Sequence, residues 1–169
     1  MSYTHDWSNH PAHLYAVDVS LGKRPAGKWV KLACKRYLDD LDTQDDGAFE
    51  FRPDVAGAWC DFFPAVLKVF KGPKAGEPFE LMEWQKFVVW TVFGWFNRET
   101  GTRRFRYAFV LISRKNGKTV FAAALALAMA IFDDEKSPDC YFLATKKDQA
   151  EEAYRSVFEF AKRSLTVRK

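Results

Sequence analysis

The stretch that decides the fold spans residues 107 to 132 and reads YAFVLISRKNGKTVFAAALALAMAIF. Its first six residues are apolar and rich in aromatic and branched side chains, which is typical of a buried strand. A polar segment follows, and residues 120 to 132 are rich in alanine and leucine, which favour a helix. A strand, a loop and a long helix in this order predict a parallel α/β sheet.

The loop between this strand and helix carries Gly117, Lys118 and Thr119, and its position is the one that a phosphate-binding loop requires. In such a loop, backbone amides and the positive end of the helix surround phosphate oxygens, and a side chain at Gly117 would obstruct them. Lys118 would reach the β and γ phosphates of a nucleotide, and Thr119 would hold Mg²⁺. The usual glycine five residues earlier is replaced by Ile112. An ordinary tight turn at Asn116 is the alternative interpretation.

The segments on either side extend the α/β pattern. Residues 140 to 145 predict a second buried strand, and apolar residues on one stripe between 150 and 161 predict a final helix. Residues 81 to 96 are dense in large apolar side chains and predict a buried helix. Helical spacing predicts three further helices, over residues 10–20, 28–41 and 54–70, the last with Pro64 as a place for a kink.

Charge is unevenly distributed, although the net charge is only +4. Between Asp39 and Asp54, seven acidic residues accompany one basic residue, which predicts an exposed acidic loop. Between Arg98 and Lys118, seven basic residues accompany one acidic residue. This second stretch indicates a surface that meets phosphate or, for residues 98 to 104, a plain solvated turn.

Composition excludes several other classes of protein. With 48% hydrophobic and 28% charged residues, the 169-residue chain is not intrinsically disordered. Its longest strongly apolar run, residues 120 to 132, is shorter than the roughly 20 residues of a membrane-spanning helix, and the N-terminus does not resemble a signal peptide. The three widely spaced cysteines predict neither a disulfide framework nor a zinc site, and His10 and His13 lack further ligands at metal-binding spacing.

Together these features resemble the large terminase subunits of tailed bacteriophages, which are the ATPases that pump DNA into the capsid. The resemblance is weaker over the N-terminal part of the chain. The motifs that carry it are, in order, Leu81-x-x-Trp84-Gln85, Phe93-Gly94-Trp95, the basic stretch from Arg103 to Arg106, the loop Ser113-Arg114-Lys115-Asn116-Gly117-Lys118-Thr119, Ala144-Thr145 and Gln149-Ala150. In that family the loop commonly lacks its first glycine, which accounts for Ile112.

The resemblance implies roles for individual residues. Ser113, Lys115, Asn116 and Gly117 would bind the nucleotide together with Lys118 and Thr119. Arg114 resembles a loop arginine near the γ phosphate and would act in catalysis with Lys118; a DNA-facing role is the alternative. Gln85 resembles a glutamine that reads the adenine ring, since an amide both donates and accepts. A capping or core-edge amide is the alternative at this position.

The resemblance also implies a P-loop NTPase-like α/β fold with an incomplete parallel sheet and a helical N-terminal lead-in. We expect residues 1–75 to form this lead-in with its acidic loop, and residues 76–169 to form the N-terminal half of the ATPase domain. Asp134-Glu135 is not predicted to be the acidic motif that completes such a site, because the preceding apolar run continues a helix. That motif and a nuclease domain are expected beyond residue 169, so the chain alone is expected to have weak activity or none.

The parent protein would couple the hydrolysis of Mg²⁺-ATP to movement of double-stranded DNA into the capsid. The implied partners are DNA, the terminase small subunit, the portal protein and other copies in a ring. They would meet in the host cytoplasm, on the procapsid and without a membrane. Two alternatives remain open, namely a helicase-like ATPase and a non-catalytic fragment that binds DNA or the small subunit.

Overall fold

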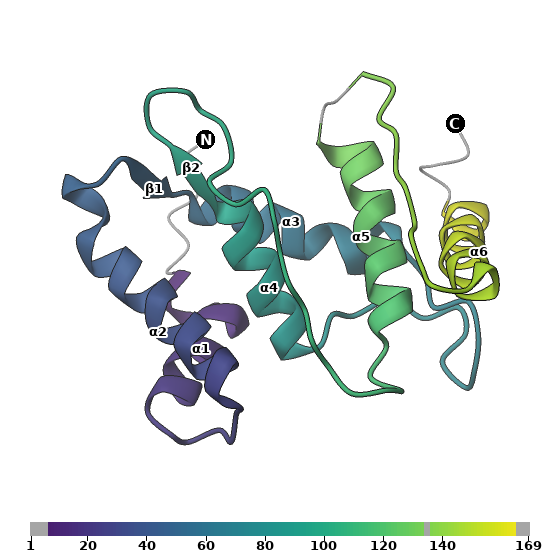
Figure 1. The fold of residues 1–169 in the computed structure, drawn as a ribbon, viewed down its shortest axis with the longest axis horizontal. Helices are drawn as coiled ribbons and strands as arrows, with labels where there is room; N and C mark the ends of the chain where they lie inside the picture. The colour runs from purple at the N-terminus through teal and green to yellow at the C-terminus, as the bar shows by residue number, and fades with distance from the viewer. Residues whose placement is uncertain (1–6, 134–135, 165–169) are drawn as a thin grey trace. The chain divides into compact units, whose positions relative to one another are not determined.

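The computed structural model describes residues 7–133 and 136–164. They are mostly helical and form two compact units (Figure 1). Among these residues, the first unit holds 7–60 and 81–109, and the second holds 61–80, 110–133 and 136–164. Helix α3 (Pro53–Val66) contributes residues to both units. The boundary expected between residues 75 and 76 remains a prediction.

The first unit is built from three further helices and a two-stranded sheet. Helix α1 (Pro11–Ser20) lies against both α2 (Lys28–Thr43) and α4 (Glu83–Gly94) (Figure 1). Strands β1 (Phe49–Phe51) and β2 (Trp95–Asn97) pair antiparallel, so that Phe51 faces Trp95. Two short 3-10 helices, η1 (Trp7–Asn9) and η2 (Gln44–Asp46), complete the unit. These bounds confirm the predicted helices with two exceptions: residues 67–70 lie beyond the end of α3, and the sequence around Trp95 forms a strand.

Trp90 lies at the centre of the first unit. Its indole N–H donates to the Tyr37 hydroxyl at 2.8 Å, and its ring stacks on His10 with ring centroids 4.0 Å apart. The Tyr37 hydroxyl also shares a hydrogen bond with the His13 Nδ1 atom 3.2 Å away, and the tautomer of His13 decides which of the two donates. Both histidines therefore serve the core of this unit, and His10 also caps α1 by accepting from the Ala12 amide.

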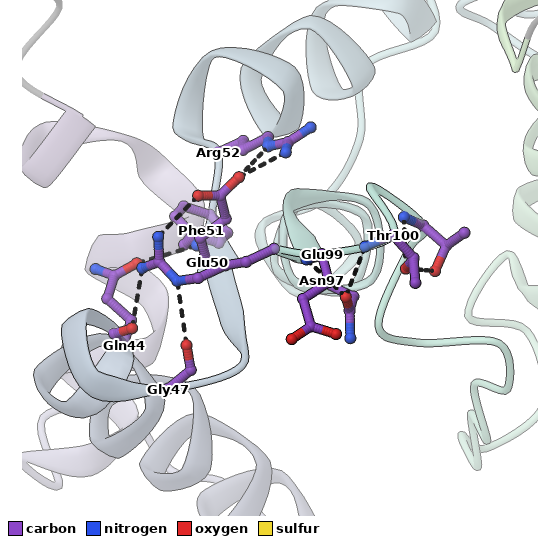
Figure 2. Close-up of polar contacts among 10 residues, drawn as sticks. Gln44, Gly47, Glu50, Phe51, Arg52, Asn97, Glu99 and Thr100 are labelled. Atoms are coloured by element: carbon purple, nitrogen blue, oxygen red, sulfur yellow. Dashed lines mark hydrogen bonds and ion pairs between the residues drawn. The ribbon is translucent and has the colours of Figure 1, made fainter.

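The acidic and basic stretches of the sequence pair with each other at the edge of this unit (Figure 2). The Glu50 carboxylate accepts from the Arg52 Nε at 2.7 Å and from the Arg98 Nη1 at 3.0 Å. Arg98 also donates to the carbonyls of Gly47 and Gln44. Its guanidinium thus fastens the start of the turn after β2 to the segment before β1.

A second arginine extends this pairing. The Arg104 Nη1 lies 2.9 Å from the Asp40 Oδ2, and its guanidinium contacts the rings of Phe49, Trp95 and Phe105. The interpretation as a solvated turn is correct for residues 98–102, which are exposed and turn after β2, whereas Arg103 and Arg104 are half-buried. Most acidic side chains of the predicted acidic loop are exposed, as expected. Its backbone is not a loop, however, because it forms the end of α2, η2 and β1.

The second unit contains the two helices predicted around the polar loop. Helix α5 (Lys118–Phe132) packs on α6 (Lys147–Arg163), and the alanines at 123, 124 and 128 are buried. Phe160 of α6 is fully buried, with the edges of Phe70 and Phe79 against it at ring-centroid distances of 5.0 and 5.1 Å. The predicted helices are confirmed here. Among the described residues, no helix has the length and apolarity needed to span a bilayer.

The parallel sheet predicted from residues 107–112 and 140–145 is not formed among the described residues, where the single sheet is the antiparallel β1–β2 pair. A strand requires a hydrogen-bonded neighbour, and the described chain supplies none to either segment. Alternate large side chains are 80 to 95% exposed as a result, namely Tyr107, Phe109 and Leu111 in one segment and Tyr141 and Leu143 in the other.

Gly94 ends α4 where a side chain has no room. A Cβ atom there would lie 2.3 Å from the Phe51 Cε2 and 2.9 Å from the Ala56 Cβ, whereas at Gly57 of α3 the nearest atom is 4.0 Å away. We expect Gly94→Ala to lower the free energy of unfolding by about 1–3 kcal/mol through overpacking. Gly57→Ala should raise it by about 0.5–1 kcal/mol through helix propensity. Urea denaturation checks both values, and equal midpoints for the two variants would contradict the packing described.

Burial lowers the pKa of His13 from its ordinary value of 6.5, because the charged ring loses hydration. The unfolded chain therefore binds a proton at higher pH than the folded chain does. The stability that depends on neutral His13 should be complete above pH 6.5 and be lost as the pH falls toward the lowered pKa. Urea denaturation between pH 7.5 and 5 should show this loss, and His13→Gln should reduce its slope. An unchanged slope in that variant would show that His13 does not cause it.

Candidate functional site

The loop Ser113–Thr119 leads directly into α5, which begins at Lys118. Gly117 is the N-cap residue and has a left-handed backbone, with φ 70° and ψ 13°. A glycine adopts this conformation without steric cost. Lys115 is also left-handed, with φ 67°, which costs about 1–2 kcal/mol for a residue with a side chain. The chain thus turns sharply twice before the helix starts.

Asn116 holds the loop in this shape. Its Nδ2 donates to the Ser113 Oγ at 2.7 Å and lies 3.4 Å from the carbonyl oxygens of Ser113 and Arg114. These contacts close the loop across its own base. Ser113 and Asn116, predicted as nucleotide-binding residues, are therefore brought together here, and in this structure they shape the loop.

The start of α5 presents backbone amides that the helix itself does not use. The first helical hydrogen bond runs from the Phe121 amide to the Gly117 carbonyl at 2.8 Å, and no side chain of the N-cap residue caps the helix. The amides of Lys118, Thr119 and Val120 accordingly have no partner within the helix. A left-handed residue followed by a right-handed one also turns successive amides toward the same side, which favours an anion there.

The charges of the loop have the same sign as the helix end. Arg114, Lys115 and Lys118 are exposed within five consecutive residues, and the loop contains no acidic residue. Thr119, half-buried, is the second residue of α5. Positive side chains and the positive end of the helix dipole therefore coincide, and the combination suits a phosphate group.

Gln85 lies in the other compact unit, in the first turn of α4. It is 2% exposed, and its Oε1 accepts from the Met82 amide at 2.8 Å. Gln85 therefore acts as a capping amide in this structure, which is the alternative interpretation of its role. An amide oxygen has a second lone pair and the amide nitrogen is a donor, so the role in reading adenine stays a prediction.

The acidic segment after α5 and the candidate metal ligands were also considered as parts of a site. Residues 129 to 132 lie in α5, as predicted, and Asp133 is its C-cap residue, while Asp134 and Glu135 lie outside the described residues. Within the described part of the chain, no group of three or more His, Cys, Asp or Glu side chains is arranged to hold a metal ion. The sequence analysis missed the left-handed Lys115 and the bracing role of Asn116, for which the pair Asn116-Gly117 was the available signal.

One comparison with known proteins gives a match. The family model of the terminase large subunit, ATPase domain, matches residues 83–168, which is just over half of the chain. The matched region includes α4, the loop, α5 and α6. Searches of curated proteins and of solved structures returned no match. The match confirms the resemblance found in the sequence, and the chain therefore belongs to the family of terminase large subunit ATPase domains.

Proposed function

We propose that this chain binds Mg²⁺-ATP at the loop Ser113–Thr119 and is the ATP-binding part of a DNA-packaging motor. The observation that carries the proposal is the start of α5, where unused amides, the left-handed Gly117 and three cationic side chains meet in the segment covered by the family match. A helix end with these properties recognises phosphate irrespective of the base attached to it.

Within this proposal each loop residue has a physical role. The amides of Lys118, Thr119 and Val120 receive phosphate oxygens, and the Lys118 ammonium group reaches the β and γ phosphates. The Thr119 hydroxyl would help to hold Mg²⁺, which would supply positive charge to neutralise the phosphates. Lys115 adds positive charge to the loop, and Arg114 is placed to stabilise charge that develops on the γ phosphate during transfer.

The proposal includes the sheet of a P-loop ATPase. In such a fold the strand before the loop lies between neighbours and is covered on both faces. Residues 107–112 precede the loop and 140–145 precede α6, and their alternate exposed side chains have the period of strands. We propose that these two segments become strands of that parallel sheet in the assembled motor.

Family membership also suggests hydrolysis of ATP coupled to translocation of double-stranded DNA. The partners would then be DNA, the small subunit, the portal protein and further copies in a ring on the procapsid in the host cytoplasm. Turnover by this chain alone is proposed to be slow, because the only Asp-Glu pair in its sequence, at 134 and 135, follows the apolar run of α5. A separate acidic residue would otherwise orient the attacking water.

Replacement of Lys118 tests the phosphate site. Lys118→Ala should weaken Mg²⁺-ATP binding at least tenfold, equal to about 1.4 kcal/mol, because the side chain that reaches the phosphates is lost. Lys136→Ala removes an exposed lysine of the same unit outside the loop and should leave binding unchanged. Calorimetric titration measures both. If the folded wild-type chain binds DNA but no nucleotide, the non-catalytic interpretation replaces this proposal.

The role of Gln85 is tested by base selectivity. Gln85→Ala should destabilise the chain by about 1 kcal/mol because the Met82 amide loses its cap. If Gln85 also reads adenine, the ratio of ATP to GTP affinity should fall toward one in this variant. Titrations of both nucleotides measure that ratio, which a general loss of stability does not change. A ratio equal to that of the wild type would leave Gln85 as a cap alone.

A further inference from the structure

Helix α2 carries its exposed charges in two separate halves. The solvent-facing stripe of its first half is basic and that of its second half, continued by η2, is acidic. The basic residues are Lys28, Lys31, Lys35 and Arg36, and the acidic ones are Asp39, Asp42, Asp45 and Asp46, all of them exposed.

This order of charges along α2 is the reverse of the order that stabilises a single helix. The positive end of the helix dipole is at the N-terminus, where acidic side chains stabilise a helix and basic ones do not. In α2 the first turn holds no acid and the last turn holds no base. The helix therefore gains nothing from this separation of charges by itself.

The charged side chains at the two ends of α2 also form few ion pairs with other described residues of the chain. In the middle, the Lys35 Nζ bonds to the Asp39 Oδ2 at 2.6 Å. Among the described residues, no ion pair joins Lys28 or Lys31 to an acid, or Asp42 to a base. The ends thus remain available to charges from another molecule.

Apolar surface accompanies the basic half. Trp29 is 75% exposed and Leu32 is 47% exposed, and both lie between the lysines of the stripe. Contact with the phosphate backbone of DNA would leave these two side chains unused and would bring the acids of the second half toward like charge. A protein surface with acidic groups fits both properties better.

We propose that α2 pairs antiparallel with α2 of a second copy of this chain, about a twofold axis. This arrangement places the basic half of each helix opposite the acidic half of the other, so that one complementary contact is made twice. The two helix dipoles also run in opposite directions. Trp29 and Leu32 of each copy are then covered by the end of the partner helix.

The size of the surface sets the strength of this pairing. A helix of 16 residues is about 24 Å long, so the pair buries less area than a stable dimer requires. Association should therefore be weak, visible at high protein concentration and reduced by salt, because exposed charges are screened over about 10 Å at 0.1 M ionic strength. The pairing is separate from nucleotide binding at the loop.

Charge reversal in each half tests the proposal on the full chain by sedimentation equilibrium at low salt. The variant Lys28→Glu/Lys31→Glu and the variant Asp42→Lys/Asp45→Lys should each associate at least tenfold more weakly than the wild type, and their equimolar mixture should recover association as a heterodimer. Trp29→Ala should weaken association as well. Lys71→Glu/Lys74→Glu changes the net charge as the variant Lys28→Glu/Lys31→Glu does, but in an exposed loop of the second unit, and it should associate as the wild type does.

Three results would overturn the proposal. A wild-type chain that stays monomeric at the highest concentration and lowest salt would show that α2 does not pair. Reversed variants that associate as strongly as the wild type, with circular dichroism showing that they are folded, would place the contact elsewhere. A mixture of the two reversed variants that fails to associate would exclude the twofold arrangement.

Discussion

The hydrogen bond between the Trp90 indole and the Tyr37 hydroxyl is the contact on which the first unit depends. It allows two of the largest side chains to be almost completely buried without leaving a polar atom unpaired, which would cost about 1–3 kcal/mol. Tyr37 comes from α2 and Trp90 from α4, while His10 and His13 bring α1 to the same place. Three helices are therefore fixed by one cluster.

The second unit depends on a different constraint, which is the left-handed turn before α5. Gly117 turns the chain into α5, whose first three amides have no acceptor within the helix, and Asn116 holds the preceding residues in place. The same geometry that starts the helix therefore leaves amides that suit an anion. In the proposed function, the residues that start the helix are also the ones that bind the nucleotide.

The helices could be predicted from the sequence because their apolar spacing and caps are local signals, and the loop could be predicted because its residue types are specific. The strands could not. Phe49-Glu50-Phe51 is too short to show a period, and residues 107–112 have strand character whose outcome depends on neighbours distant in the chain. The ion pairs of Arg98 with Glu50 and of Arg104 with Asp40 also depend on segments distant in the chain. The capping contact of Gln85 with the Met82 amide is local and is one of the two interpretations that the sequence leaves open.

The central claim is that the first amides of α5 receive the phosphates of a nucleotide. Amide hydrogen exchange of the full chain, followed by mass spectrometry with and without Mg²⁺-ATP, tests it most directly, because it reports on the backbone of residues 117–120 itself. The account predicts slower exchange in peptides that contain these residues when nucleotide is present. Unchanged exchange there, in a chain whose helices remain protected, would contradict it.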